Sequence, residues 1–268
     1  MFWPLLRGKI DTEGLEFTHE RADTETLNER ALSGEVDVIA ISIGHYANLT
    51  EHYLLLPHGA SIGRGYGPVV VAKKSAPLES FAGKRIGIPG LRTTAYLTLR
   101  LLLNEFDAKV IPIAPYATVF NALANNEIDA ALLIHEGRLT FEREGYQKVV
   151  DVGAGWSALT GGLPLPLGGN AIRRSLGPEL VAKVSRLCRA SIAWALAHRD
   201  EVIDALLKEE SRADVGLDRA MLDKYLAMYA NDDTREMKDD VKAAIVELFK
   251  RARERGILGP NATPEFAP

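Results

Sequence analysis

Cysteine is almost absent from this chain, which has a single cysteine, Cys188, in 268 residues. One cysteine excludes an intrachain disulfide and any metal cluster built from cysteines. Cys188 lies in a helix-like segment, where a packed thiol is the expected role. The histidines His45, His52 and His58 are not spaced as metal ligands and no carboxylate cluster joins them, so we expect no metal site.

Long apolar runs and basic clusters are also missing. No run approaches the roughly 18 apolar residues of a membrane span, and residues 1–9 show no secretory signal pattern. Lys and Arg number 32 against 36 Asp and Glu, a formal net charge of -4, with no basic stripe that would bind nucleic acid. We therefore expect a cytoplasmic protein, monomer or homodimer, that binds neither membranes nor nucleic acid.

Helical and extended segments alternate along the chain, which predicts an α/β fold. Strands are expected at 10–18, 36–43, 69–72, 85–89, 110–113, 128–134 and 149–152. The run from about 85 to 152 reads as β-α-β-α-β, which is typical of a parallel sheet. Helices are expected near the chain start, at 23–32, 94–103 and 118–124, and then at 178–198, 201–207, 217–229 and 237–256.

The late helices also predict how the chain is divided. Segment 163–170 contains Pro164 and Pro166 and is expected to be a crossover, because proline is excluded from the interior of a central strand. The helices that follow most simply pack on strands before residue 75. We therefore expect a discontinuous first lobe, residues 1–72 and 169–268, with residues 73–168 as an inserted second lobe.

One expected strand ends abruptly on polar residues. The apolar run 130–134 is followed by His135 and Glu136. In open α/β sheets ligands bind at the carboxyl ends of the strands, so His135 is a candidate catalytic or ligand-binding residue. A histidine that is merely capped by a backbone carbonyl at a strand end is the alternative.

An internal likeness links this strand to an earlier one. Residues 28–37 and 121–129 each read as a helix end followed by a Glu-apolar-Asp turn. The strand after the first ends on Ser42, and the strand after the second ends on His135. If the lobes are pseudo-equivalent, these two side chains face one another across a cleft, although βα proteins also produce such likenesses by chance.

The start of the helix expected at 94–103 is a candidate anion site. A helix N-terminus presents N–H groups without intrahelical partners and the positive end of the helix dipole. Thr93 and Thr94 would add hydroxyl donors there, so a carboxylate or phosphate would bind well. Simple N-capping by one threonine is the alternative, and Arg92 would add charge or lie solvated.

Five blocks over nearly the whole chain carry a resemblance to a known family. They are Glu25-Thr-Leu-Asn28, Gly63-Arg-Gly-Tyr-Gly-Pro68, Pro89-Gly-Leu-Arg-Thr-Thr-Ala-Tyr96, Leu133-Ile-His-Glu136 and Thr160-Gly-Gly-Leu-Pro-Leu-Pro-Leu-Gly168. In this order they resemble the MqnD family, the 1,4-dihydroxy-6-naphthoate synthases of the futalosine route to menaquinone.

The resemblance implies a fold and a reaction. The fold would be the periplasmic-binding-protein type II fold, with two α/β lobes that close on a ligand. The enzyme would be a carbon–carbon lyase that releases 1,4-dihydroxy-6-naphthoate from cyclic dehypoxanthinyl futalosine. His135 would be the proton acceptor, a role that suits a neutral imidazole. Substrate-binding positions would be Ala40, Ile41, Ser42, Thr93 and Thr94. Because aromatisation supplies the driving force, no cofactor or metal is required.

The chain departs from the family in two places. Many relatives have Lys-Leu-Ser where this chain has Ala40-Ile41-Ser42, which removes a cation near the substrate. Relatives also carry a first strand and a Ser-Pro-x-Pro-Asp-Asp-like segment before the counterpart of residues 2–6, whereas this sequence begins at Met1. We therefore expect a late start codon or a truncated form, with weak activity or a fold completed from outside this sequence.

Two other functions stay open. One is a solute-binding protein of the same fold, which captures a small carboxylate and needs no base at His135. The other is the sister enzyme of the pathway, which dehydrates chorismate. The blocks around Thr93 and His135 favour the naphthoate synthase over the sister enzyme.

Overall fold

Two β-sheets organise the protein. The computed structural model describes residues 1–268 except 114, 116, 136, 210–218 and 261. Within the described residues, the first sheet has four strands: β1 (Val38–Ser42), β2 (Tyr53–Leu55), β3 (Ser61–Gly63) and β9 (Leu165–Arg173). The second has the order β6-β5-β7-β4-β8, with β4 (Val69–Ala72), β5 (Arg85–Ile88), β6 (Asp107–Val110), β7 (Ala130–Leu133) and β8 (Gln147–Asp151).

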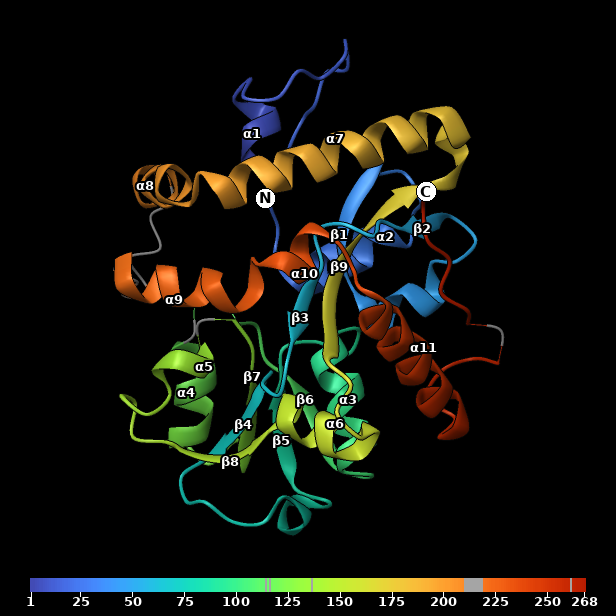
Figure 1. The fold of residues 1–268 in the computed structure, drawn as a ribbon. Helices are drawn as coiled ribbons and strands as arrows, with labels where there is room; N and C mark the ends of the chain where they lie inside the picture. The colour runs from blue at the N-terminus through green and yellow to red at the C-terminus, as the bar shows by residue number, and fades with distance from the viewer. Residues whose placement is uncertain (114, 116, 136, 210–218, 261) are drawn as a thin grey trace.

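Helices flank both sheets. The α-helices are α1 (Trp3–Leu6), α2 (Thr24–Ala31), α3 (Thr94–Leu102), α4 (Ala117–Ala124), α5 (Gly137–Thr140), α6 (Val152–Thr160), α7 (Pro178–Ala197), α8 (Arg199–Glu209), α9 (Arg219–Tyr229), α10 (Asp232–Arg235) and α11 (Asp239–Glu254). The 3-10 helices are η1 (Ile43–Asn48), η2 (Leu78–Phe81) and η3 (Arg174–Leu176). Figure 1 shows the first sheet in the upper half under α7, and the second sheet in the lower half beside α4 and α5.

The expectation that residues 163–170 form only a crossover is wrong. They lead into β9, which pairs antiparallel with β1, β2 and β3 and so lies at the centre of the first sheet. The sheet tolerates Pro166 because β9 pairs with β1 only from Gly168 onward. Pro166 faces β3 instead, next to a register shift between Ser61 and Ile62. A missing N–H at an irregular strand end removes little ladder bonding.

Two chain segments belong to a different sheet from the one that the expected lobe division suggests. β4, which we expected in the first lobe, pairs antiparallel with β7 and β8 in the second sheet. Residues 165–168 belong to β9 and therefore to the first sheet. The expected parallel run holds for β5, β6 and β7, whereas β8 joins the sheet through the antiparallel β4. Residues 10–18, expected as a strand, form none.

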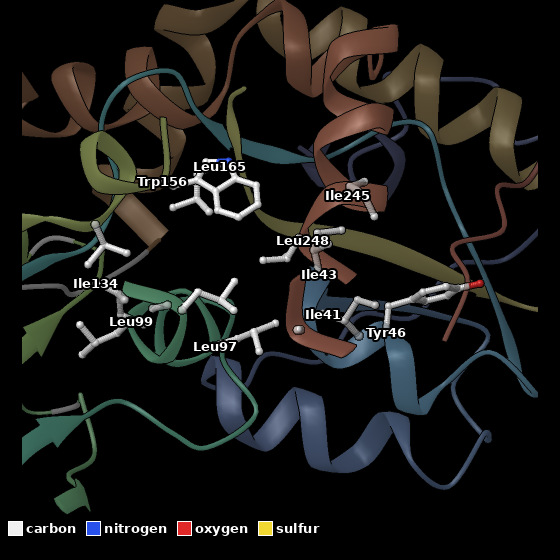
Figure 2. Packing of buried hydrophobic residues seen from close by; sticks show 14 of the residues in the cluster. Ile41, Ile43, Tyr46, Leu97, Leu99, Ile134, Trp156, Leu165, Ile245 and Leu248 are labelled. Carbon is white, nitrogen blue, oxygen red and sulfur yellow. The ribbon is translucent and has the colours of Figure 1, made fainter. Parts of the chain in front are cut away.

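A continuous apolar cluster joins the two halves of the molecule. It includes Ile43 and Leu248 beside the first sheet, and Ile134 and Leu99 beside the second. Figure 2 shows Leu97 and Leu99 of α3 in the lower part of this cluster, with Trp156 and Leu165 above them. Each fully buried side chain of this size contributes roughly 1.5–3 kcal/mol through burial. The core therefore fixes α3, whose first turn lies at the site described next.

Candidate active site

The ends of β1 and β7 meet at one cavity of about 190 Å³. All of the site residues expected from the sequence line this cavity, namely Ala40, Ile41, Ser42, Thr93, Thr94 and His135. The internal likeness predicted Ser42 and His135 on one cleft, and they do share these walls. The geometry therefore brings together a strand-end hydroxyl, a helix N-terminus and an imidazole from three separate elements.

The buried residue Asn28 of α2 fixes Ser42 through two hydrogen bonds. The backbone N–H of Ser42 donates to Asn28 Oδ1 at 2.8 Å, and Asn28 Nδ2 donates to Ser42 Oγ at 3.0 Å. Because the Ser42 oxygen accepts from Asn28, its own proton points toward another acceptor. Ser42 can therefore donate one hydrogen bond to a ligand in the cavity.

A buried histidine supports Asn28 in turn. His45 Nε2 lies 2.9 Å from the backbone carbonyl oxygen of Asn28. Because this oxygen can only accept a hydrogen bond, Nε2 carries the proton. Asn48 Nδ2 lies 3.2 Å from His45 Nδ1 and donates to it. Burial lowers the pKa of His45 to about 4, which keeps the ring neutral above that pH.

The two threonine hydroxyls are engaged with the backbone. The Thr93 hydroxyl donates to Gly90 O at 2.9 Å and accepts from Tyr96 N at 3.2 Å, which makes Thr93 the N-cap of α3. The Thr94 hydroxyl donates to Leu167 O at 2.6 Å and accepts from Gly44 N at 2.9 Å. Both protons go to backbone carbonyls. The donors at this end of the cavity are therefore the N–H groups of the first turn of α3 rather than the hydroxyls.

His135 follows β7 in an unusual backbone conformation. Its φ is +50°, in the left-handed region, where non-glycine residues are uncommon and often functional. The ring is half-buried, and its Nε2 lies 3.1 Å from Thr24 Oγ1 on α2. Glu136, which follows His135 in the sequence, lies outside the described residues.

The far wall of the cavity is formed by α9 through Tyr229. Arg138 of α5 reaches this wall: its Nη1 lies 3.4 Å from the Tyr229 hydroxyl and its guanidinium 5.5 Å from the Tyr66 ring centroid. Arg138 also pairs with Asp151 at 3.0 Å, and both side chains are largely buried. Burial raises the pKa of Tyr229, so its phenol stays protonated at neutral pH.

At Gly59, in the glycine-rich turn 59–68, the backbone approaches a neighbouring side chain closely. Gly59 has φ +85°, and a Cβ there would lie 2.0 Å from the buried Asn170 amide nitrogen. That nitrogen donates to Gly59 O at 3.1 Å. The turn therefore packs against the central strand β9 and forms one side of the cavity with Gly59, Ser61, Pro68 and Asn170.

Charge is sparse at the cavity. The described residues that line it include no lysine or arginine, and Ala40 stands where the resemblance places a lysine. Arg92 is not among the lining residues. Its Nη1 binds Glu25 at 3.1 Å and Glu29 at 2.9 Å. An anion in the cavity would therefore be bound by N–H and O–H donors and by the dipole of α3.

Reasoning from the sequence missed Thr24 as a cavity residue and Asn28 as the support of Ser42. Asn28 shares one helix face with the apolar residues Leu27 and Ala31, and a lone amide on such a face needs a buried partner. That signal could have identified Asn28. The contact of Thr24 could not be found this way, because its partner is 111 residues away.

This architecture, with two sheets and a cavity at strand and helix ends, is that of the periplasmic solute-binding proteins. The alkanesulfonate-binding protein SsuA from Xanthomonas axonopodis pv. citri shares the fold with a TM-score of 0.62, at 14% identity, over 88% of this chain and 81% of that protein. A crystal structure of a protein from Archaeoglobus fulgidus is more similar, with a TM-score of 0.87 and 41% identity, covering 96% of this chain and 93% of that one.

Within this class, the chain belongs to the menaquinone biosynthesis family. The family model matches residues 1–254. The 1,4-dihydroxy-6-naphthoate synthase of Thermus thermophilus is 35% identical over 268 residues, which is 99% of this chain and 94% of the relative. The family resemblance and the fold expected from the sequence are both confirmed. Among the described residues, no helix has the length and apolar content needed to cross a bilayer.

Proposed function

We propose that the protein is a 1,4-dihydroxy-6-naphthoate synthase that acts on cyclic dehypoxanthinyl futalosine, with His135 as the proton acceptor. One observation carries the proposal: His135, Ser42 and the first turn of α3 line the same cavity. The relative from Thermus thermophilus, similar over 99% of this chain, bears the name of that activity. An imidazole beside an anion site is suited to removing a proton from a bound carboxylate-bearing molecule.

The substrate carboxylate would bind at the N-terminus of α3. An α-helix leaves its first N–H groups without intrahelical acceptors, and the Thr93 cap satisfies only that of Tyr96. The N–H groups of Thr94 and Ala95 belong to residues of the cavity wall. Together with the Ser42 hydroxyl they provide donors for one carboxylate, and the helix dipole adds favourable charge.

The remaining walls suit the apolar body of an aryl carboxylate. Leu27, Ile134, Leu167 and the Tyr229 ring line the cavity together with Ile41. With the carboxylate held at α3, the ring system would lie between these side chains with His135 to one side. His135 would take a proton as the bond to the sugar remnant breaks, and formation of the aromatic product would drive the reaction. The residues themselves need only bind, orient and accept that proton.

Product formation tests the proposal directly. Purified protein is incubated with cyclic dehypoxanthinyl futalosine, and 1,4-dihydroxy-6-naphthoate is sought by mass-resolved chromatography. We expect product from the wild type and a loss of at least about 10²-fold in kcat for His135→Gln, the usual contribution of a general base. His52→Gln, at an exposed histidine away from the cavity, is the matched control and should react as the wild type does.

A solute-binding protein of small carboxylates is the competing function, since the fold is shared with sulfonate-binding proteins. Calorimetric titration of wild type and His135→Gln separates the two. Binding without turnover in the wild type, unchanged by the substitution, would establish the binding protein and reject the enzyme. Chorismate is tested in the same assay, and its dehydration would identify the sister enzyme instead.

A further inference from the structure

Thr24 and His135 make a polar contact between two distant parts of the fold. Thr24 Oγ1 lies 3.1 Å from His135 Nε2. Thr24 is the first residue of α2, which packs on β1 of the first sheet, whereas His135 follows β7 of the second. Both residues line the cavity. The partner of the imidazole therefore comes from a helix of the first sheet, and not from the sheet that carries His135 itself.

Local structure holds Thr24 firmly in place. Asp23 caps α2 by accepting hydrogen bonds from Glu25 N and Thr26 N, at 3.0 and 3.1 Å. The next residue of the helix, Glu25, accepts from the backbone N–H of Arg92 at 3.2 Å, just before the N-cap Thr93 of α3. The first turn of α2 is thus tied both to its own cap and to the segment that carries the anion site.

The chemistry of a protonated imidazole defines what Thr24 does. Once His135 has accepted a proton, both of its ring nitrogens are donors, so Nε2–H must donate to Thr24 Oγ1. Hydrogen bonds from a charged donor are roughly twice as strong as neutral ones. Thr24 therefore stabilises the imidazolium more than the neutral ring, whichever tautomer is present beforehand.

We propose that Thr24 is a positioning residue for His135, which orients the imidazole and stabilises it after it has taken up the substrate proton. The inference rests on the proposed function of His135 as a base. The left-handed backbone of His135 supports it, because a conformation of that kind persists only where surrounding contacts hold it. α2 packs on the first sheet, whereas His135 follows a strand of the second sheet. The contact therefore makes the orientation of the imidazole depend on how the two sheets are placed relative to one another.

Thr24→Val tests this role, because valine has the shape of threonine without its oxygen. We expect kcat to fall about tenfold, close to the contribution of one charge-assisted hydrogen bond, with KM changed less than about twofold. The acid limb of the pH profile of kcat/KM should move to lower pH, since the variant loses the acceptor that favours the imidazolium. Burial raises the pKa of Tyr229, so that phenol titrates above this limb.

Two matched variants separate positioning from a general effect on the fold. Thr24→Ser keeps the hydroxyl and should restore most of kcat and the pH profile. Thr26→Val removes an exposed hydroxyl on the same helix turn, which donates to Asp23 Oδ2. This control should lower the melting temperature slightly and leave kcat and the acid limb unchanged.

A nuclear magnetic resonance titration of the His135 ring, assigned by its loss in His135→Gln, gives a readout without turnover. In Thr24→Val the His135 pKa should be lower than in the wild type. An unchanged pKa together with wild-type kcat would overturn the role of Thr24 while leaving the proposed function intact. If His135→Gln keeps full activity, the proposed function itself fails. The titration alone then shows whether Thr24 stabilises the protonated His135 ring.

Discussion

Asn28 holds Ser42 through both ends of its side-chain amide, with the carbonyl accepting from the Ser42 backbone and the amide nitrogen donating to its hydroxyl. This pairing joins helix α2 to the end of strand β1, and Asn28 has no exposed surface. It also sets the direction in which the Ser42 proton points. A ligand carboxylate in the cavity would use that proton, so the position of Asn28 influences binding without contact with the ligand.

Asn28→Leu should therefore destabilise the protein and weaken substrate binding. The substitution leaves the buried N–H of Ser42 without its acceptor, which costs about 1–3 kcal/mol in the free energy of unfolding. The Ser42 hydroxyl also loses its orienting donor, so KM should rise more than kcat falls. Urea denaturation and steady-state kinetics measure the two effects, and a stable variant with unchanged KM would contradict this role.

Stability should fall on acidification because of His45. The pKa of its buried ring is about 4, below the ordinary value of 6.5, so the unfolded chain binds a proton that the folded protein excludes. The associated stability is present above pH 6.5 and is lost as the pH falls toward 4. Its size is about 3 kcal/mol. Burial also lowers the pKa of His58, which adds to the loss in the same direction.

His45→Leu checks this assignment by urea denaturation between pH 4 and 7. The variant is less stable at pH 7, because Asn28 loses a donor, but its stability should depend less on pH than that of the wild type. His52→Gln, at an exposed histidine, should keep the wild-type dependence. Equal pH dependence in His45→Leu and the wild type would assign the acid sensitivity to other groups.

The cavity could be anticipated from the sequence because strand ends obey simple rules. A buried run that stops at Ser42 and another that stops at His135 both place polar groups at a sheet edge, and these residues line one cavity. The helix N-terminus at Thr93 was equally readable, since threonine before an apolar run is a capping signal. These features depend on a few neighbouring residues, so local rules suffice for them.

Pairing between distant strands could not be derived in this way. Pro166 counted against a central strand, yet β9 avoids the penalty by pairing with β1 only beyond Gly168. The valines of β4 are buried on both faces, a pattern that fits either sheet, so the sequence did not show that β4 pairs with β7. The Thr24–His135 contact likewise depends on tertiary packing. Register and partner choice are properties of the whole fold.

Gly168 and Gly169 of β9 should respond differently to alanine. A Cβ at Gly168 meets only ordinary contacts, the nearest at 3.4 Å from Ile41 O, and Gly168 lines the cavity. Gly168→Ala should leave stability within about 0.5 kcal/mol and raise KM, because its methyl group occupies ligand space. A Cβ at Gly169 would lie 2.8 Å from Ile43 Cδ1, so Gly169→Ala should cost about 1–3 kcal/mol through overpacking.

Thermal denaturation and kinetics on the two variants check this contrast. Gly259→Ala serves as the control, since a Cβ there meets nothing within 4 Å, and it should change neither quantity. A fall in the stability of Gly168→Ala as large as that of Gly169→Ala would show that the strand, rather than the ligand, needs the space at Gly168.

The ion pair between Arg138 and Asp151 should be strongly coupled, because it lies in the interior beside the cavity wall. The two side chains are only 10% and 14% exposed. Arg138→Met leaves the Asp151 carboxylate without its cation, which should cost about 3 kcal/mol. The cost is limited because Asp151 also caps α6 by accepting from Gly153 N and Ala154 N.

A double-mutant cycle with Asp151→Asn measures this coupling. Asparagine keeps the capping function, so this variant isolates the loss of charge beside Arg138. The double variant should be more stable than the sum of the two single effects predicts, by at least about 1 kcal/mol, because neither charge is then left buried alone. Arg138→Met should also raise KM, since Arg138 contacts the hydroxyl of Tyr229 on the cavity wall. Additive effects on stability would instead show that each charge is compensated by groups other than its partner.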